Sequence, residues 1–276
     1  MSGWANIERV PEGHTIHRKV VDQSPLMAGR HLAVSSPNRR FESGAAILDG
    51  RLLERIDAWG KHLFYFFEGR RVLHVHLGMD GRFRHHRGPV TGAGPPGRGT
   101  WLRASAPALT FDLGSPRVCE VIDEQRQRAI VARLGPDPIR GDDGMAALAP
   151  IRASGLPIGA ALMDQSLVAG IGNIYRAEIL YACAIHPGRP SGTLSREEWA
   201  GIWSTAARLM TAGVRDRGEI HTVDRRDLRV RDGRRVHVYG QRLCARCGSP
   251  VRSWDLAGRV AYACETCQPR WPASVT

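Results

Sequence analysis

Four cysteines near the end of the 276-residue chain have the spacing of a metal site. Cys244 and Cys247 are separated by two residues, as are Cys264 and Cys267, and sixteen residues lie between the two pairs. A β-hairpin over those sixteen residues would bring four thiolates to one tetrahedral Zn²⁺. Disulfide bonding is the alternative, but it is typical of secreted domains and nothing in this sequence indicates secretion. We therefore expect one structural zinc ion.

Lysine is rare in this chain, although basic residues are plentiful. There are 39 lysines and arginines against 27 acidic residues, a formal net charge of +12, and only Lys19 and Lys61 are lysines. The excess of positive charge favours nucleic acid as a partner, although a GC-rich genome would also raise the arginine content. Arginine stays protonated near neutral pH and cannot donate a proton, whereas an amine can. Lys61 is therefore a candidate for chemistry that needs an amine.

No segment is typical of export or of membrane insertion. The first ten residues, MSGWANIERV, lack the apolar core of a signal peptide. No run approaches the roughly 18 apolar residues of a membrane span. We expect a monomeric cytoplasmic protein with no membrane partner.

Residues up to about 135 predict a β-sandwich or barrel. The Gly- and Pro-rich stretch Arg87–Thr100 favours neither helix nor strand, and we interpret it as a mobile loop. The sequence LGPDPIRGDDG at residues 134–144 ends the pattern. Short apolar segments, often with Gly or Pro between them, predict strands at His31–Ser36, Leu52–Trp59, His62–Phe67, Val72–Leu77, Ala108–Leu113 and Arg117–Asp123.

Beyond this break the apolar period becomes helical. Ser195 and Glu198 form the pattern of a capping box, and Asn173 is suitably placed to cap the helix that follows it. The arginine-dense stretch 221–235 predicts a linker. Helices are expected at Met145–Ala153, Ile158–Gln165, Ile174–Cys183 and Ser195–Ala212. The sequence thus predicts an α+β chain with a β-sandwich domain over residues 11–135, a helical domain over 140–235 and a zinc finger over 236–270.

The segment 162–187 contains a turn that suits phosphate binding. It has a helix, the small-residue turn VAGIG and a second helix that starts at Asn173. Gly170 and Gly172 let the backbone approach another surface closely, and the N–H groups at a helix start attract phosphate. Glycine in such a turn is also common for steric reasons alone, so the turn by itself does not identify a function.

The sequence DQSLVAGIGNIYRAE within this segment closely resembles the helix–two-turn–helix of the formamidopyrimidine-DNA glycosylase/endonuclease VIII (Fpg/Nei) family. The resemblance covers residues 10 to 270 and implies an N-terminal β-sandwich, a helix–two-turn–helix domain and a C-terminal zinc-finger β-hairpin. Four further motifs follow the family's order: Pro11-Glu12-Gly13, Gly60-Lys61, His76-Leu77-Gly78-Met79, and the cysteine hairpin with Gly258-Arg259.

The resemblance also implies a mechanism. The family flips a damaged nucleotide out of duplex DNA, excises the base and cleaves the strand. Carried over by motif, Pro11 is the nucleophile, Glu12 its acid/base partner, and Lys61 a phosphate contact and proton donor. An N-terminal amine has a pKa of about 7.7–8.0, against about 10.4 for lysine, so more of it is unprotonated. Proline gives an iminium that cannot lose its charge by deprotonation, which drives elimination of the 3′ and then the 5′ phosphate.

The same resemblance assigns contacts to DNA and a branch of the family. Asn173 and Arg259 would clamp phosphates, and Met79 would fill the hole left by the extruded base. Thr15 stands where many relatives carry a second glutamate, and His14 stands where proline is common. Residues 112–120, DLGSPRVCE, lack the Arg-Phe pair of the 8-oxoguanine-specific branch. The resemblance therefore favours the endonuclease VIII branch, which prefers oxidised pyrimidines.

In the sequence as written Pro11 is internal, and there its nitrogen is an amide that cannot attack carbon. Residues 1–10 show no periodicity and no cap, and a GTG codon is read either as valine, here Val10, or as an initiator. We therefore expect the functional chain to begin at Pro11, with residues 1–10 as a non-native extension.

The expected activity is a bifunctional DNA glycosylase/AP lyase for base excision repair, associated with the bacterial nucleoid. One alternative is a catalytically silent protein of the same fold that binds lesions or abasic sites. An unrelated zinc-ribbon module that binds nucleic acid would also fit the charge and the cysteines, but it leaves the other motifs unexplained.

Overall fold

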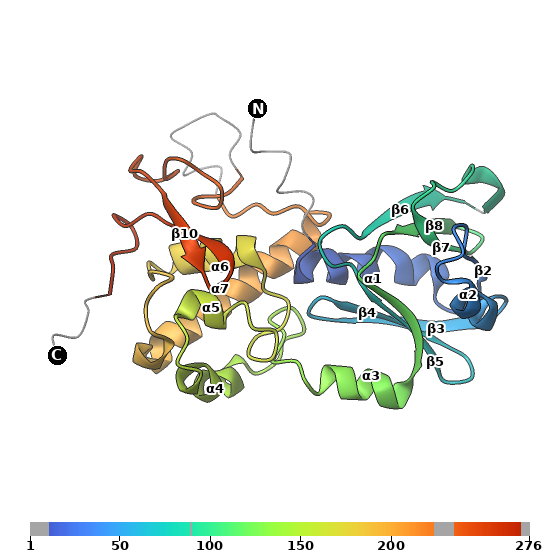
Figure 1. Ribbon diagram of the computed structural model, residues 1–276, viewed down its shortest axis with the longest axis horizontal. Coiled ribbons are helices and arrows are strands. Elements are labelled where there is room, and N and C mark those ends of the chain that lie inside the picture. Colours follow the sequence, from blue (N-terminus) through green and yellow to red (C-terminus); the bar gives the residue numbers. More distant parts are fainter. Residues whose placement is uncertain (1–10, 89, 224–234, 272–276) are drawn as a thin grey trace. The chain divides into compact units, whose positions relative to one another are not determined.

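The computed structural model describes residues 11–88, 90–223 and 235–271, so the predicted extension and most of the predicted linker lie outside the described residues. The chain forms two compact units (Figure 1), one mainly of residues 15–133 and one of residues 12–14 with those from 134 onward. Within the described ranges, no helix is long and apolar enough to cross a membrane.

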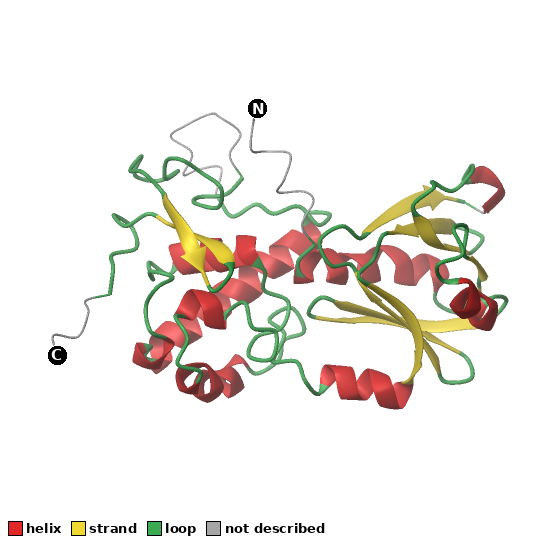
Figure 2. Cartoon of the chain, viewed as in Figure 1, coloured by secondary structure: helices red, strands yellow, loops and turns green. Residues whose placement is uncertain are grey.

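The first unit contains two antiparallel sheets (Figure 2). Their facing side chains share one core, to which β4 contributes Leu63, Tyr65 and Phe67. Because side chains alternate along a strand, Phe64 and Phe66 lie on the opposite face of β4. One sheet has the order β1 (Arg30–His31), β3 (Leu52–Trp59), β4 (His62–Phe67), β5 (Arg71–His76), β9 (Val118–Asp123). The other has the order β2 (Ala33–Ser35), β7 (Thr100–Ser105), β8 (Leu109–Gly114), β6 (Arg82–Arg87).

The strand-like interpretation of this half missed three helices and two strands. The helices are α1 (Gly13–Met27), α2 (Glu42–Leu48) and α3 (Glu124–Val131). In α1, Ile16, Val20 and Met27 recur at helical spacing and pack into the sandwich core. Strand β6 was missed because it is polar on its outer face, and β7 because a Gly- and Pro-rich stretch precedes it. That stretch contains one short 3₁₀ turn, η2 (Val90–Gly92).

The second unit is helical and ends in a β-hairpin. The predicted capping box is confirmed, since Ser195 and Glu198 bond reciprocally at the start of α7. The helix predicted at Ile158–Gln165 is a single turn, and the rest of that segment is a loop. The elements are η3 (Gly144–Ala147), α4 (Leu148–Ala153), α5 (Ile158–Ala161), α6 (Asn173–Ala182), η4 (Ser191–Thr193), α7 (Arg196–Arg215), β10 (Arg252–Leu256) and β11 (Arg259–Ala263).

Helices α6 and α7 pack against each other in the core of this unit. Ile174, Tyr175 and Ile179 of α6 pack with Trp199 and Ile202 of α7. A smaller cluster joins the last turn of α6 to the cysteine hairpin. The predicted fold class is therefore confirmed: a β-sandwich, then a helical domain with a cysteine-bearing hairpin.

Candidate functional site

Glu12 fixes the start of α6. Its side chain is fully buried, and its carboxylate accepts hydrogen bonds from three backbone N–H groups. The donors are Gly172 at 3.0 Å, Ile174 at 2.8 Å and Tyr175 at 3.3 Å. A helix leaves such N–H groups unpaired at its first turn, and the helix dipole favours a negative charge there. Glu12 therefore caps α6, although it lies 160 residues before Gly172 in the sequence.

The small-residue turn before α6 makes room for this carboxylate. At Gly172, a Cβ atom would lie 2.3 Å from the Cδ of Glu12, which is closer than real side chains approach. Gly170 accepts a hydrogen bond of 2.8 Å from the backbone N–H of Gly13. These contacts hold Glu12 and Gly13 in place, and Pro11 directly precedes them.

Asn173 does not cap α6, so the predicted capping role is wrong. Gly172 is the N-cap residue, without a side-chain cap, and Asn173 is the first helical residue. The Glu12 carboxylate accepts from the N–H of Tyr175, one of the groups that an asparagine cap at 173 would bind. The Nδ2 of Asn173 instead donates to the carbonyl oxygen of Val260 on the hairpin, at 3.1 Å.

Arg176 fastens Asn173 to the hairpin. Its side chain is buried and donates to the Oδ1 of Asn173 and, at 2.7 Å, to the Val260 carbonyl. Burial lowers the pKa of Arg176 to about 10 despite the nearby Glu12 carboxylate, so the guanidinium remains charged at neutral pH. Val260 follows Arg259 in the chain, so one buried guanidinium holds the segment of Arg259 beside Asn173.

The four hairpin cysteines form one cluster. Their sulfur atoms all lie within 4.8 Å of one another. Three sulfur pairs are 3.5, 3.6 and 3.9 Å apart. A tetrahedral zinc ion with Zn–S bonds of about 2.3 Å keeps its sulfurs about 3.8 Å apart. The arrangement therefore fits one metal ion held by Cys244, Cys247, Cys264 and Cys267.

Lys61 and Met79 belong to the first unit. Lys61 lies on the turn between β3 and β4, after Gly60, whose φ of +55° suits glycine. Met79 follows β5, and it is 55% exposed. His62 pairs with His76 across β4 and β5, so Lys61 and Met79 lie at the same end of this strand pair.

A chain of hydrogen bonds crosses three strands beside Lys61. The Nδ1 of His62 lies 2.9 Å from the Nε2 of His74, and the Nδ1 of His74 lies 2.8 Å from the Oε1 of Glu120. Burial lowers the pKa of His62 to about 3 and that of His76 to about 4, and the charge of Lys61 adds to both shifts. Both imidazoles are therefore neutral around pH 7.

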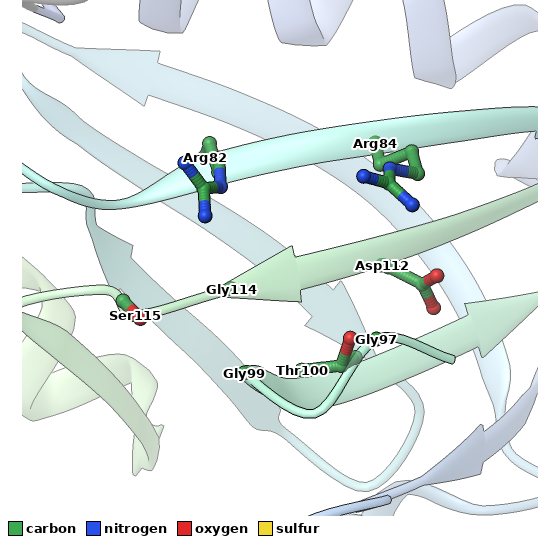
Figure 3. Close-up of a pocket in the computed structure, with 8 residues that line it drawn as sticks. All are labelled: Arg82, Arg84, Gly97, Gly99, Thr100, Asp112, Gly114 and Ser115. Atoms are coloured by element: carbon green, nitrogen blue, oxygen red, sulfur yellow. The ribbon is translucent and has the colours of Figure 1, made fainter.

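A small polar pocket lies on the four-stranded sheet (Figure 3). Its carboxylate, Asp112, is bound by Arg103 through hydrogen bonds of 2.6 and 2.8 Å and by His86 at 3.1 Å. Because that carboxylate is fully engaged, we assign no acid/base chemistry to the pocket. The lining residues are Arg82, Arg84, Gly97, Gly99, Thr100, Asp112, Gly114 and Ser115.

Several buried polar groups of the second unit were not predicted. Glu178 accepts backbone hydrogen bonds from His237, Val238 and Tyr239 at 2.7, 2.9 and 2.9 Å. Together with Arg176 it interrupts the apolar pattern of α6 with charge at buried positions. Charged residues are almost never fully buried unless paired, so this interruption was the available signal.

Two family models match the chain. The formamidopyrimidine-DNA glycosylase N-terminal domain matches residues 5–127, and the formamidopyrimidine-DNA glycosylase H2TH domain matches residues 134–224. The chain belongs to the formamidopyrimidine-DNA glycosylase family. The predicted family is thereby confirmed, and so is the predicted enzyme class: a DNA glycosylase of DNA repair with AP lyase activity.

Relatives within this glycosylase family match almost the full length of the chain. Endonuclease 8 1 of Mycobacterium tuberculosis is 40% identical over 268 residues, which cover 94% of this chain and all of that protein. The formamidopyrimidine-DNA glycosylase of Thermus thermophilus is 31% identical over 274 residues, 95% of this chain and 99% of that one. The fold is similar to that of Lactococcus lactis Fpg, solved with DNA containing an abasic site, with a TM-score of 0.78, 22% identity and coverage of 94% and 100%.

Proposed function

We propose that this glycosylase excises oxidised bases, with pyrimidines favoured, from duplex DNA through a Schiff base on Pro11. It then cleaves the abasic strand by β,δ-elimination. The observation that carries the proposal is the position of Glu12, the residue directly after Pro11. Its carboxylate caps α6 and is held there by three backbone N–H groups. The Lactococcus lactis relative, solved with abasic DNA, supports DNA as the partner. A monomer in the cytoplasm fits this role.

The residues divide the chemistry between them. The Pro11 nitrogen attacks C1′ as the base departs, and the resulting iminium draws electrons for loss of the 3′ and then the 5′ phosphate. Glu12 is held by three backbone donors in the position directly after Pro11. In its protonated form it can give a proton to the sugar ring oxygen as the ring opens. Lys61 contacts a phosphate and supplies a proton.

The proposed DNA contacts lie on both units. Asn173 and Arg259 bind phosphates, supported by the buried Arg176 that holds their segments together. Met79 enters the stack where the damaged nucleotide leaves, and its exposed side chain suits that role.

The preference for pyrimidines rests on the connection between β8 and β9. It consists of Ser115, Pro116 and Arg117, with Ser115 at a φ of +45°. Three residues give a tight turn without an Arg-Phe pair to probe the opposite strand. Excision from matched duplexes with 5-hydroxyuracil or 8-oxoguanine measures this preference, and faster release of 8-oxoguanine would contradict it.

Zinc is the proposed occupant of the cysteine cluster. The four cysteines would hold one Zn²⁺ that stabilises the hairpin carrying Arg259 and takes no part in base removal. Metal analysis of the purified protein should find about one zinc per chain.

Borohydride trapping on an abasic duplex tests the Schiff base. Because the nucleophile needs a free amine, a protein that begins Met-Pro11 and loses its methionine should form a covalent adduct. The full 276-residue chain should not form one. In the shorter protein, Pro11→Ala keeps a free N-terminus at the same position but replaces the secondary amine of proline with a primary amine. This variant is the control for the start site. Equal trapping by both lengths, without processing of the longer one, would exclude Pro11 as the nucleophile.

A second candidate function follows from the sequence as written, in which Val10 precedes Pro11. If the native protein keeps this peptide bond, the chain would bind lesions or abasic sites without cutting them. The same experiment separates the two, because tight binding of abasic DNA without an adduct by the native protein indicates a binder. Intact mass of protein from the native host gives its start directly.

A further inference from the structure

Tyr181 places a hydroxyl group against the cysteine cluster. It lies in the last turn of α6, and its side chain is 6% exposed. Its hydroxyl is 3.2 Å from the Sγ of Cys244 and 3.8 Å from the Sγ of Cys267. Its ring stacks on His237 with a centroid separation of 4.7 Å.

The direction of this hydrogen bond follows from the chemistry of the cluster. Cysteine binds zinc as a thiolate, which has no proton to donate, so the phenol must be the donor. Four thiolates around a divalent ion leave a net charge of −2, and Cys244 and Cys264 are buried, with little access to water. A buried charge is costly unless hydrogen bonds satisfy it.

We propose that Tyr181 is a positioning residue that donates its hydroxyl hydrogen bond to the zinc-bound sulfurs of Cys244 and Cys267. The bond spreads negative charge off these sulfurs and slows metal loss. It also fixes the finger to α6, the helix whose first residue is Asn173. This inference rests on the proposed zinc occupancy, and it adds a donor outside the four ligands.

Packing alone does not explain the hydroxyl. A phenylalanine at 181 would keep the ring contact with His237 but would leave the two sulfurs without this donor. The ring of His237 in turn lies with its Nδ1 3.2 Å from the Oε2 of Glu178. A continuous set of contacts therefore runs from the metal ligands through Tyr181 and His237 to a carboxylate on the same helix.

Cobalt substitution tests the proposal on the full-length protein. In the Co²⁺-loaded form, Tyr181→Phe should move the sulfur-to-cobalt charge-transfer band to lower energy, because the thiolates lose a hydrogen bond. In the Zn²⁺ form, metal affinity in chelator competition should fall about 10–100-fold, as is typical when an outer-shell partner is removed. Tyr262→Phe is the matched control, since Tyr262 belongs to the same cluster and no sulfur contact of its hydroxyl is found among the described residues.

A second substitution guards against misfolding. Replacing Tyr181 with a fluorotyrosine, a more acidic phenol of nearly equal size, should move the band to higher energy and slow metal loss. Wild-type spectra and metal retention in both Tyr181 variants would overturn the role of Tyr181. Failure of the wild-type chain to bind either zinc or cobalt would instead overturn the zinc proposal itself, so the two failures are distinguishable.

Discussion

The first turn and the middle of α6 each hold a buried carboxylate, and the two are satisfied differently. Glu12 reaches α6 from another part of the chain and accepts the helix's own N–H groups. Glu178 belongs to the helix and accepts N–H groups of residues 237–239 and the hydroxyl of Thr222. Burial alone would raise the pKa of Glu178, but hydrogen bonds from His237 and Thr222 outweigh it and the pKa is lowered.

The difference teaches that burial does not decide what a carboxylate does. The donors of Glu178 come from Thr222 and from residues 237–239, so the group is a structural link to the chain leading into the finger. Glu12 instead binds N–H groups that the helix presents anyway, and it directly follows Pro11 in the chain. We therefore expect substitutions at Glu12 to affect chemistry and substitutions at Glu178 to affect stability.

The largest effect should come from Glu12→Gln. Removing an acid/base group typically slows the reaction about 10²–10⁴-fold, and we expect base excision to fall by that amount. Single-turnover excision measures it, with the unfolding free energy of the same protein as control. If the variant unfolds readily but excises normally once DNA stabilises it, the roles of the two carboxylates would be reversed.

Lys61→Arg should have the next largest effect, and it tests the chemical role of Lys61 separately from its charge. Arginine keeps the charge but cannot donate a proton, so base excision should fall about tenfold or more while binding to abasic DNA is retained. Lys19→Arg provides a control on the other lysine of the chain. Equal excision by Lys61→Arg and the wild type would show that any cation suffices at this turn.

Glu178→Gln should act on stability instead. The amide nitrogen would face buried N–H donors, and each donor left unsatisfied costs about 1–3 kcal/mol. Because the pKa of Glu178 is lowered in the folded state, its stabilisation is present above about pH 4.3 and is lost as the pH falls below that value. Urea unfolding should therefore separate the variant from the wild type at pH 7 and bring them together in acid. A gap that does not shrink in acid would argue against a charged Glu178.

The smallest effect concerns the hairpin of β10 and β11, which Arg176 holds beside Asn173. If Arg259 binds a phosphate, Arg259→Ala should reduce the slope of log K against log salt by about 0.9. Arg252→Ala is the matched control, because Arg252 lies on the same hairpin and pairs with Glu265 at 3.5 Å. Titration of abasic duplex at several salt concentrations gives both slopes. Equal slopes for Arg259→Ala and the wild type would remove Arg259 from the interface.

The features that could be predicted from sequence are those that depend on the spacing of residues close together in the chain. The cysteine pairs predicted the hairpin cluster, and the capping box predicted the start of α7, because both depend on neighbours in the chain. The helix α1 was within reach too, since Ile16, Val20 and Met27 show its period, but short apolar segments around it favoured strands.

What could not be predicted depends on contacts between distant residues. The capping role given to Asn173 was wrong because the helix begins one residue earlier than expected, and a carboxylate 160 residues from Gly172 binds its first N–H groups. Local sequence propensity cannot reveal a hydrogen-bond acceptor that lies so far away in the chain. The hydrogen bond between His62 and His74 likewise depends on the register of β4 and β5, which a single sequence does not fix.

The half-buried histidines His62 and His76 beside Lys61 also affect how this surface responds to acid. With pKa values of about 3 and 4, His62 and His76 take up no proton in the range of about pH 5 to 8 where ordinary histidines titrate. Neither ring adds charge on mild acidification, so neither can repel the ammonium group next to it. At the end of the sandwich that carries Lys61, mild acidification therefore leaves these two imidazoles neutral, whereas the imidazoles of a typical histidine-rich surface would become charged.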